Sequence, residues 1–317
     1  MSLPIAAGGV GHTGRVAERL APEQTALLIS SRPERPRGRT GRWLRRLLSL
    51  AITVVVLAGG ALATLHFLAI HRSAQEIRAT ALVPPELPAR VLVVLARPGQ
   101  EVPMAGTLTA LDRAGAEVSV LSLTRGEAQP PQIEAAGEGI AEIRSDELAR
   151  AGDLFGAESV KFATYADGTL IAAEPGEVTA RIAKAIKKTQ PSTVLTVSDA
   201  TGGDTDSQAV AAYAVAAAQA EGSGVARVWT VTRGDREISW NALLSEPMGQ
   251  LRVPEPQVAV RIDDATTTKG KVLLAHGTQS PDLVAQSYPY GDRIPAWAYF
   301  RFWDREYFAL AWGQPLG

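Results

Sequence analysis

One run of sequence constrains the chain more than any other. Leu47–Ile70 reads LLSLAITVVVLAGGALATLHFLAI and holds 24 residues without Asp, Glu, Lys or Arg. About 20 apolar residues in a helix cross the hydrocarbon of a bilayer. The run is apolar on all sides, which disfavours a surface helix of a soluble protein. We therefore expect a transmembrane signal-anchor helix over residues 43–71, with a cleaved signal peptide ending near Ala61–Ala63 as the alternative.

The charges are distributed unevenly on the two sides of this run. Residues 1–72 contain ten Arg and three Glu, a balance of +7, and most of these arginines precede the apolar run. Positive flanking charge marks the cytoplasmic side, so we expect a cytoplasmic N-terminus and an extracytoplasmic C-terminal part in the cell membrane. The Gly-, Pro- and Arg-rich residues 1–42 are expected to be a disordered tail, and residues 72–89 a linker.

The C-terminal part is acidic and the chain contains no cysteine. Residues 73–317 carry 22 basic and 30 acidic side chains, a balance of −8. This balance argues against nucleic acid as a partner. The absence of cysteine excludes disulfides, thiolate catalysis and cysteine-ligated metal.

From residue 90 onward, segments with the pattern of strands alternate with segments of helical period. Strands are expected at 91–96, 116–124, 159–165, 192–198 and 225–232, and helices at 104–114, 140–155, 177–188 and 207–220. This alternation predicts a Rossmann-like, doubly wound, mostly parallel α/β domain over residues 90–317. Sites in such domains lie beyond the carboxyl ends of the strands. The loops at 97–101, 124–127, 166–168 and 198–207 are therefore expected to converge.

These loops and later segments carry an ordered series of motifs. They are ARPGQEVPMAGTL (96–108), LTRGEA (123–128), RSDELARAGDLFG (144–156), YADGTL (165–170), GDTDSQAV (203–210), KGKVLLAHGTQ (269–279) and EYF (306–308). The series resembles the LmbE-like, or GlcNAc-phosphatidylinositol de-N-acetylase (PIG-L), family of zinc-dependent deacetylases of N-acetylglucosamine-containing substrates. The resemblance covers about residues 90–310 and implies the family's fold.

The residues at the family's reactive positions differ from the family pattern. In the family, zinc is held by His and the second Asp of A-H-P-D-D-E and by the last His of G-H-P-D-H. The resemblance places Arg97, Gln100 and Ser207 at these positions. It also places Gly99 where the family has its general base, and Asp204 where a histidine helps to stabilise the oxyanion.

These replacements remove the donor chemistry that zinc needs. Catalytic zinc takes about three N or O protein ligands and keeps an open position for water. Arginine stays protonated and cannot ligate, and glycine takes no proton. We therefore expect a pseudoenzyme with no catalytic residues, no bound zinc and no other cofactor.

The polar residues that remain are candidates for binding a ligand. They are Arg97, Glu101, Arg125, Asp167, Asp204, Asp206 and His276. We expect Arg97 to pair with Asp204, Asp206 or Glu101, because a buried carboxylate needs a counter-charge. In an alternative interpretation, Mg²⁺ or Ca²⁺ is held by oxygen atoms of Asp199, Asp204, Asp206 and Glu101.

The sequence thus favours a membrane-anchored, inactive family member that binds a protein partner in the cell envelope or membrane. One alternative is an active N-acetyl-amino-sugar de-N-acetylase with a rearranged, metal-dependent site. The other is a glycan- or lipid-headgroup-binding module in which Arg97 contacts an anionic group.

Overall fold

The computed structural model describes residues 39–70, 74–84, 89–128, 139–197, 205–234, 254–279, 295, 299–300 and 303–316. The chain divides into two compact units, residues 1–62 and 63–317. Helix α2 (Arg39–Ile70) accounts for the described part of the first unit and continues into the second. Within it, Trp43–Ala61 is long and apolar enough to cross a membrane.

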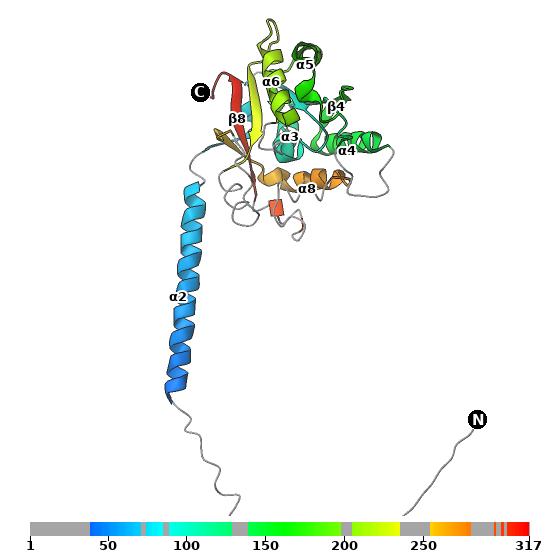
Figure 1. The fold of residues 1–317 in the computed structure, drawn as a ribbon. Helices are drawn as coiled ribbons and strands as arrows, with labels where there is room; N and C mark the ends of the chain where they lie inside the picture. The colour runs from blue at the N-terminus through cyan, green and yellow to red at the C-terminus, as the bar shows by residue number, and fades with distance from the viewer. Residues whose placement is uncertain are drawn as a thin grey trace, which may run out of the picture. The chain divides into compact units, whose positions relative to one another are not determined.

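The second unit is built on one eight-stranded sheet in the order β1-β7-β8-β6-β5-β2-β3-β4 (Figure 1). The strands are β1 (Gln75–Ile77), β2 (Arg90–Leu95), β3 (Glu117–Ser122), β4 (Ala157–Phe162), β5 (Thr193–Thr196), β6 (Arg227–Thr232), β7 (Val258–Arg261) and β8 (Arg305–Gly313). Among the described strands, only β8 runs antiparallel to its neighbours, β6 and β7. The predicted doubly wound, mostly parallel α/β fold is confirmed.

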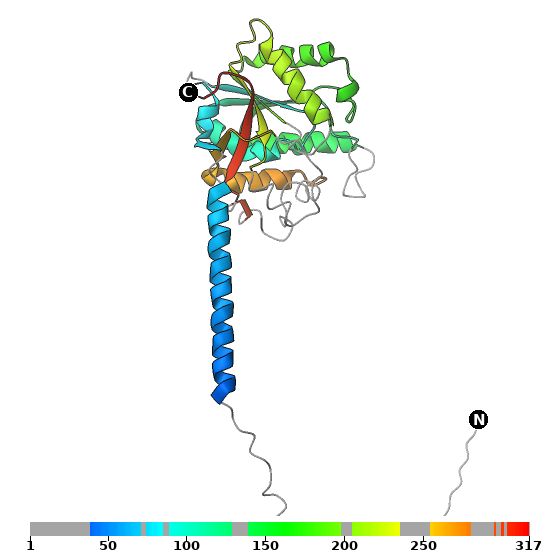
Figure 2. The ribbon, with the colours of Figure 1, turned by 60° about the vertical axis from the view of Figure 1, so that its left-hand side comes forward.

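Helices cover both faces of the sheet. They are α3 (Ala105–Arg113), α4 (Ile140–Phe155), α5 (Pro175–Thr189), α6 (Thr205–Gln219) and α8 (Thr266–Ala275), with short 3-10 turns η1 (Ala79–Leu82), η2 (Val102–Met104), η4 (Leu170–Ala172) and η6 (Asp263–Ala265). Helices α3, α4 and α8 lie on one face and α5 and α6 on the other (Figure 2).

Strand β2 divides its side chains between two hydrophobic cores. Val91, Val93 and Leu95 pack towards α3, α4 and α8, whereas Leu92 and Val94 pack towards α5 and α6. Successive side chains of a strand point to opposite faces, so a strand buried on both sides must be apolar throughout. This requirement explains the run VLVVL.

The segment predicted to be a linker contributes to the domain. Strand β1 pairs in parallel with β7, and Leu82 of η1 is fully buried. The carbonyl of Leu82 accepts a hydrogen bond from the indole N–H of Trp229 at 3.1 Å. Glu76 accepts two hydrogen bonds from Arg305 of β8, at 3.1 and 2.8 Å. Residues 75–83 are therefore fixed to the sheet edge rather than free.

Candidate functional site

The candidate site lies at the point where the strand order reverses. Strand β2 neighbours β3 on one side and β5 on the other, so the chain winds outward in both directions from β2 and β5. The crevice beyond the carboxyl ends of two such strands is the usual ligand site of doubly wound sheets. The loop of residues 97–101 follows β2, and α6 begins at Thr205 after β5.

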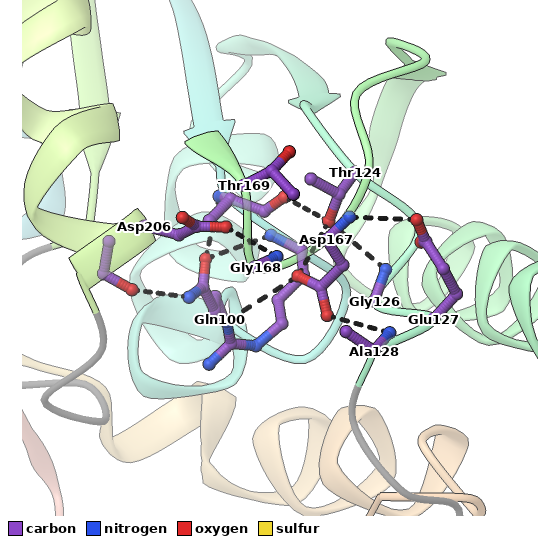
Figure 3. A network of polar contacts seen from close by, with 12 residues as sticks. Gln100, Thr124, Gly126, Glu127, Ala128, Asp167, Gly168, Thr169 and Asp206 are labelled. Carbon is purple, nitrogen blue, oxygen red and sulfur yellow. Dashed lines mark hydrogen bonds and ion pairs between the residues drawn. The ribbon is translucent and has the colours of Figure 1, made fainter. Parts of the chain in front are cut away.

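Two of the positions that the resemblance assigns to zinc ligands are joined directly to each other. Gln100 Nε2 donates a hydrogen bond to Ser207 Oγ at 2.7 Å, and both side chains are buried. Gln100 Oε1 accepts hydrogen bonds from the backbone N–H of Ala96 at 2.8 Å and of Arg97 at 3.2 Å. The carboxamide therefore links the loop of residues 97–101 to α6 and also fixes the turn within this loop (Figure 3).

The third ligand position, Arg97, carries a guanidinium beside a carboxylate. Arg97 Nη1 lies 3.8 Å from Asp167 Oδ1, and the Asp167 side chain is fully buried. Burial raises the pKa of Asp167, against the opposing effects of the Arg97 charge and of a hydrogen bond from Thr124. Of the acids expected to pair with Arg97, Glu101 contacts His276 and Asp206 accepts hydrogen bonds from backbone N–H groups, whereas Asp204 lies outside the described residues.

The acidic side chains around the loop of residues 166–171 hold its backbone in place. Asp206 accepts hydrogen bonds from the N–H groups of Gly168 at 2.9 Å and Ile171 at 3.2 Å. Asp167 accepts from the hydroxyl of Thr124 and the N–H of Ala128, and Glu127 accepts from the N–H of Asp167 (Figure 3). Hydrogen bonds from backbone N–H groups to an ionised carboxylate are charge-assisted, and they stabilise the carboxylate without supplying a counter-charge.

A buried histidine contacts the loop of residues 97–101. His276 Nε2 contacts Glu101 Oε1, while His276 Nδ1 lies 4.0 Å from Glu147 Oε2. Burial by itself would lower the pKa of His276, but the charge and hydrogen bond of Glu101 and the charge of Glu147 raise it overall. The two carboxylates lie at opposite nitrogens of one ring, so they cannot converge on a single ion together with it.

Sequence reasoning assigned no role to Glu147 or Arg144, although both belong to the recognised motif RSDELARAGDLFG. Glu147 accepts hydrogen bonds from the N–H and hydroxyl of Thr278, at 2.7 and 2.8 Å. Arg144 is buried and donates to the carbonyl of Gly126. Arg125, a predicted ligand contact, donates to Ser145 Oγ at 2.7 Å and lies over the ring of Phe162. The motif thus ties α4 to the loops at the sheet's carboxyl edge.

The position of the family's general base has an unusual backbone conformation. Gly99 has φ = +92°, and its N–H donates to Glu101 Oε2 at 2.9 Å. Side-chain-bearing residues rarely adopt this φ. The loop is therefore shaped around glycine, and an aspartate at position 99 would be strained.

The residues at the three ligand positions do not fit zinc. They supply a guanidinium, a carboxamide whose oxygen and nitrogen are both hydrogen-bonded, and a hydroxyl that accepts from that carboxamide. Within the described part of the chain, no group of three His, Asp or Glu side chains is placed to hold a metal ion. Of the acids considered for Mg²⁺ or Ca²⁺, Asp199 and Asp204 lie outside the described residues, and Asp206 and Glu101 are engaged as above.

Known proteins share this fold and part of this sequence. A 1D-myo-inositol 2-acetamido-2-deoxy-alpha-D-glucopyranoside deacetylase of Kineococcus radiotolerans is 28% identical over 73% of this chain and 79% of its own. The N,N'-diacetylchitobiose deacetylase of Pyrococcus horikoshii aligns with a TM-score of 0.51 at 19% identity, over 70% of this chain and 83% of its own.

A further solved structure with this fold is named for a different enzymatic activity. GalB, the 4-carboxy-2-hydroxymuconate hydratase of Pseudomonas putida KT2440, aligns with a TM-score of 0.53 at 18% identity, over 72% of this chain and 98% of its own. At such identities the two structures establish the fold alone. The family model for GlcNAc-PI de-N-acetylase (PIG-L) matches residues 92–218. Over these residues the chain is similar to the PIG-L/LmbE-like family, and its fold is that of the LmbE-like deacetylases.

Proposed function

We propose that this chain is a membrane-anchored member of the family that does not hydrolyse amides and instead serves as a binding or scaffold subunit of the cell envelope. The observation that carries the proposal is the hydrogen bond from Gln100 Nε2 to Ser207 Oγ. It joins two positions that would have to direct lone pairs at one metal ion in a zinc deacetylase of this family. A donor that points at the neighbouring ligand position is incompatible with that arrangement.

The remaining chemistry of the loop supports the same proposal. Metal-dependent amide hydrolysis needs an activated water and a group that takes its proton. Position 99, which the resemblance assigns to that group, is a glycine. His276 is fully buried, and its Nε2 contacts Glu101 Oε1.

The proposed location rests on α2 and on the charge distribution. Trp43–Ala61 suffices to span a bilayer, and arginines are concentrated before it. We infer a single-pass protein of the cell membrane with a cytoplasmic tail and an extracytoplasmic domain. Its partner would be a protein of the same membrane or of the envelope.

A second candidate function follows from Arg97. Its side chain keeps 15% of its area exposed at the carboxyl edge of the sheet, whereas the paired Asp167 is fully buried. A guanidinium in this position can bind a carboxylate or phosphate oxygen. The alternative is therefore a module that recognises an anionic glycan or lipid headgroup without cleaving it.

Metal content and acetate release test the first proposal. The full-length chain, purified in detergent, is analysed for bound zinc and is assayed for acetate released from a GlcNAc conjugate, with the Kineococcus radiotolerans deacetylase as a positive control. We expect substoichiometric zinc and no acetate above the level without protein. Stoichiometric zinc together with turnover would overturn the proposal in favour of an active de-N-acetylase with a rearranged site.

The chain's lack of cysteine permits a direct test of topology. Single substitutions Ser30→Cys and Glu221→Cys place one thiol on each side of α2, and Glu221 is exposed. In intact cells a membrane-impermeant maleimide should label the Glu221→Cys variant alone. Labelling of the Ser30→Cys variant alone would show the opposite orientation. Recovery of the chain in the soluble fraction would contradict the proposed membrane anchor.

A further inference from the structure

Three residues of the loop 97–101 connect it to three different parts of the domain. Gln100 bonds to Ser207 of α6, Arg97 pairs with Asp167 of the loop before η4, and Glu101 contacts His276 after α8. In the family, a zinc ion would join this loop to the start of α6. Here protein groups make the connection.

The Gln100 carboxamide is matched to its surroundings at both ends. Its oxygen accepts from two backbone amides and its nitrogen donates to the hydroxyl of Ser207. A carboxylate has no hydrogen to donate, so the family's aspartate could reproduce only the first half of this pattern. Buried hydrogen bonds of this kind stabilise the folded state, and a buried polar group left without its partner destabilises it.

The backbone reinforces this arrangement. The positive φ of Gly99 directs its N–H at Glu101 Oε2, and Glu101 Oε1 in turn contacts His276. A residue with a side chain at position 99 would be strained in this conformation. The replacements at 99, 100 and 207 therefore belong to one alternative loop structure rather than to separate losses.

We infer that the Gln100–Ser207 hydrogen bond is a protein-made replacement for the zinc cross-link, holding the β2 loop against α6 so that the domain reaches its full stability without metal. The inference rests on the proposal that the site is metal-free. It adds that Gln100 and Ser207 act as one coupled unit, and that the loop is built around glycine.

A double-mutant cycle on the full-length chain in detergent tests the coupling. Ser207→Ala should raise the unfolding equilibrium constant roughly tenfold, and Gln100→Ala should raise it further because its bonds to Ala96 and Arg97 are also lost. The double variant should unfold less readily than the two single effects together predict. Gln208→Ala is the matched control, because Gln208 is the exposed neighbour of Ser207 on α6, and it should combine additively with Gln100→Ala.

The same unfolding curves are measured with EDTA and with added zinc, and the wild-type midpoint should not move between them. Additive effects of Gln100→Ala and Ser207→Ala, or a midpoint lowered by EDTA, would overturn the inference. If Gln100→Ala does not fold, Gln100→Met replaces it in the cycle, since Met has a similar length and carries no strong donor or acceptor. Acetate release tests the proposed function separately, so additivity in an inactive, metal-free protein overturns this inference alone.

Discussion

His276 Nε2 and Glu101 Oε1 are in direct contact in the interior of the domain, with both side chains fully buried. The second carboxylate, Glu147, lies near the other ring nitrogen. An imidazolium between two carboxylates compensates charges that would otherwise be buried alone.

This contact predicts how stability depends on pH. The pKa of His276 is raised above its ordinary value of 6.5, because the two glutamates outweigh the effect of burial. A histidine with a raised folded-state pKa contributes stability that is fully present below the unfolded-state value of 6.5 and is lost as pH rises through the folded-state value. Wild type should therefore lose this contribution towards alkaline pH.

The variant His276→Gln isolates the effect of the imidazole. It should lower the free energy of unfolding by about 3 kcal/mol at pH 6, since it leaves a buried carboxylate without its cation. Urea unfolding of both proteins from pH 6 to 9 should show that the difference between their free energies of unfolding becomes smaller as pH rises. A difference that stays constant over this range would show that folding does not shift the pKa of His276.

Glu306 should be one of the most sensitive positions in the domain. Its carboxylate accepts hydrogen bonds from the N–H groups of Gly106 at 2.9 Å and Thr107 at 2.7 Å, and pairs with Lys269 at 2.6 Å. The variant Glu306→Ala should lose about 3–5 kcal/mol of stability, because the helix start and the buried ammonium lose their acceptor. Glu306→Gln, which keeps one acceptor oxygen, should lose less. Thermal melts compare both with Glu158→Ala on the exposed part of β4, for which no change is expected.

Gly156 should tolerate alanine poorly for two separate reasons. It ends α4 with φ = +81°, and a Cβ there would overlap the Asp112 carboxylate. Gly115 is a matched control, because its φ is +85° and a Cβ added there would meet no heavy atom within 4 Å. In urea unfolding, Gly115→Ala should cost about 1 kcal/mol, and Gly156→Ala about 1–3 kcal/mol more. Equal losses would show that the Asp112 side chain moves aside freely.

Variants that restore the family's residues should distinguish the effect of the three zinc-ligand positions from the effect of the general-base position. The triple variant Arg97→His, Gln100→Asp, Ser207→His supplies three zinc ligands and keeps Gly99. Adding Gly99→Asp places a side chain at φ = +92° and strains the loop. Zinc titration should therefore show weaker binding by the quadruple variant than by the triple. Equal affinity would show that the loop adapts readily to aspartate.

The sequence predicted the sheet well but the contacts of the site poorly. The runs of β-branched and apolar residues located β2, β3, β5 and β6, because strands buried on both faces are apolar almost throughout. The edge strand β4 is only partly buried. Asp167 was not among the partners expected for Arg97, since it lies 70 residues away in the sequence and other carboxylates were expected near the same guanidinium. The resemblance brought Gln100 and Ser207 to one site, but their hydrogen bond depends on side-chain conformations that no sequence pattern encodes.

Short polar segments were also difficult to predict from composition. Residues 72–89 contain three prolines and no long apolar run, which is typical of a linker. Strand β1 nevertheless forms there, because the edge of β7 offers free backbone groups and Arg305 binds Glu76. Both depend on residues more than 180 positions further along the chain.

The attachment of β1 and η1 decides where a soluble version of the domain can begin. A chain started at residue 89 would lack the strand that covers β7, and it would leave the Trp229 indole without the Leu82 carbonyl as acceptor. An uncovered strand edge invites pairing between molecules. Expression trials that begin at Ala74 should therefore give a monodisperse domain, whereas those that begin at Ala89 should give aggregates.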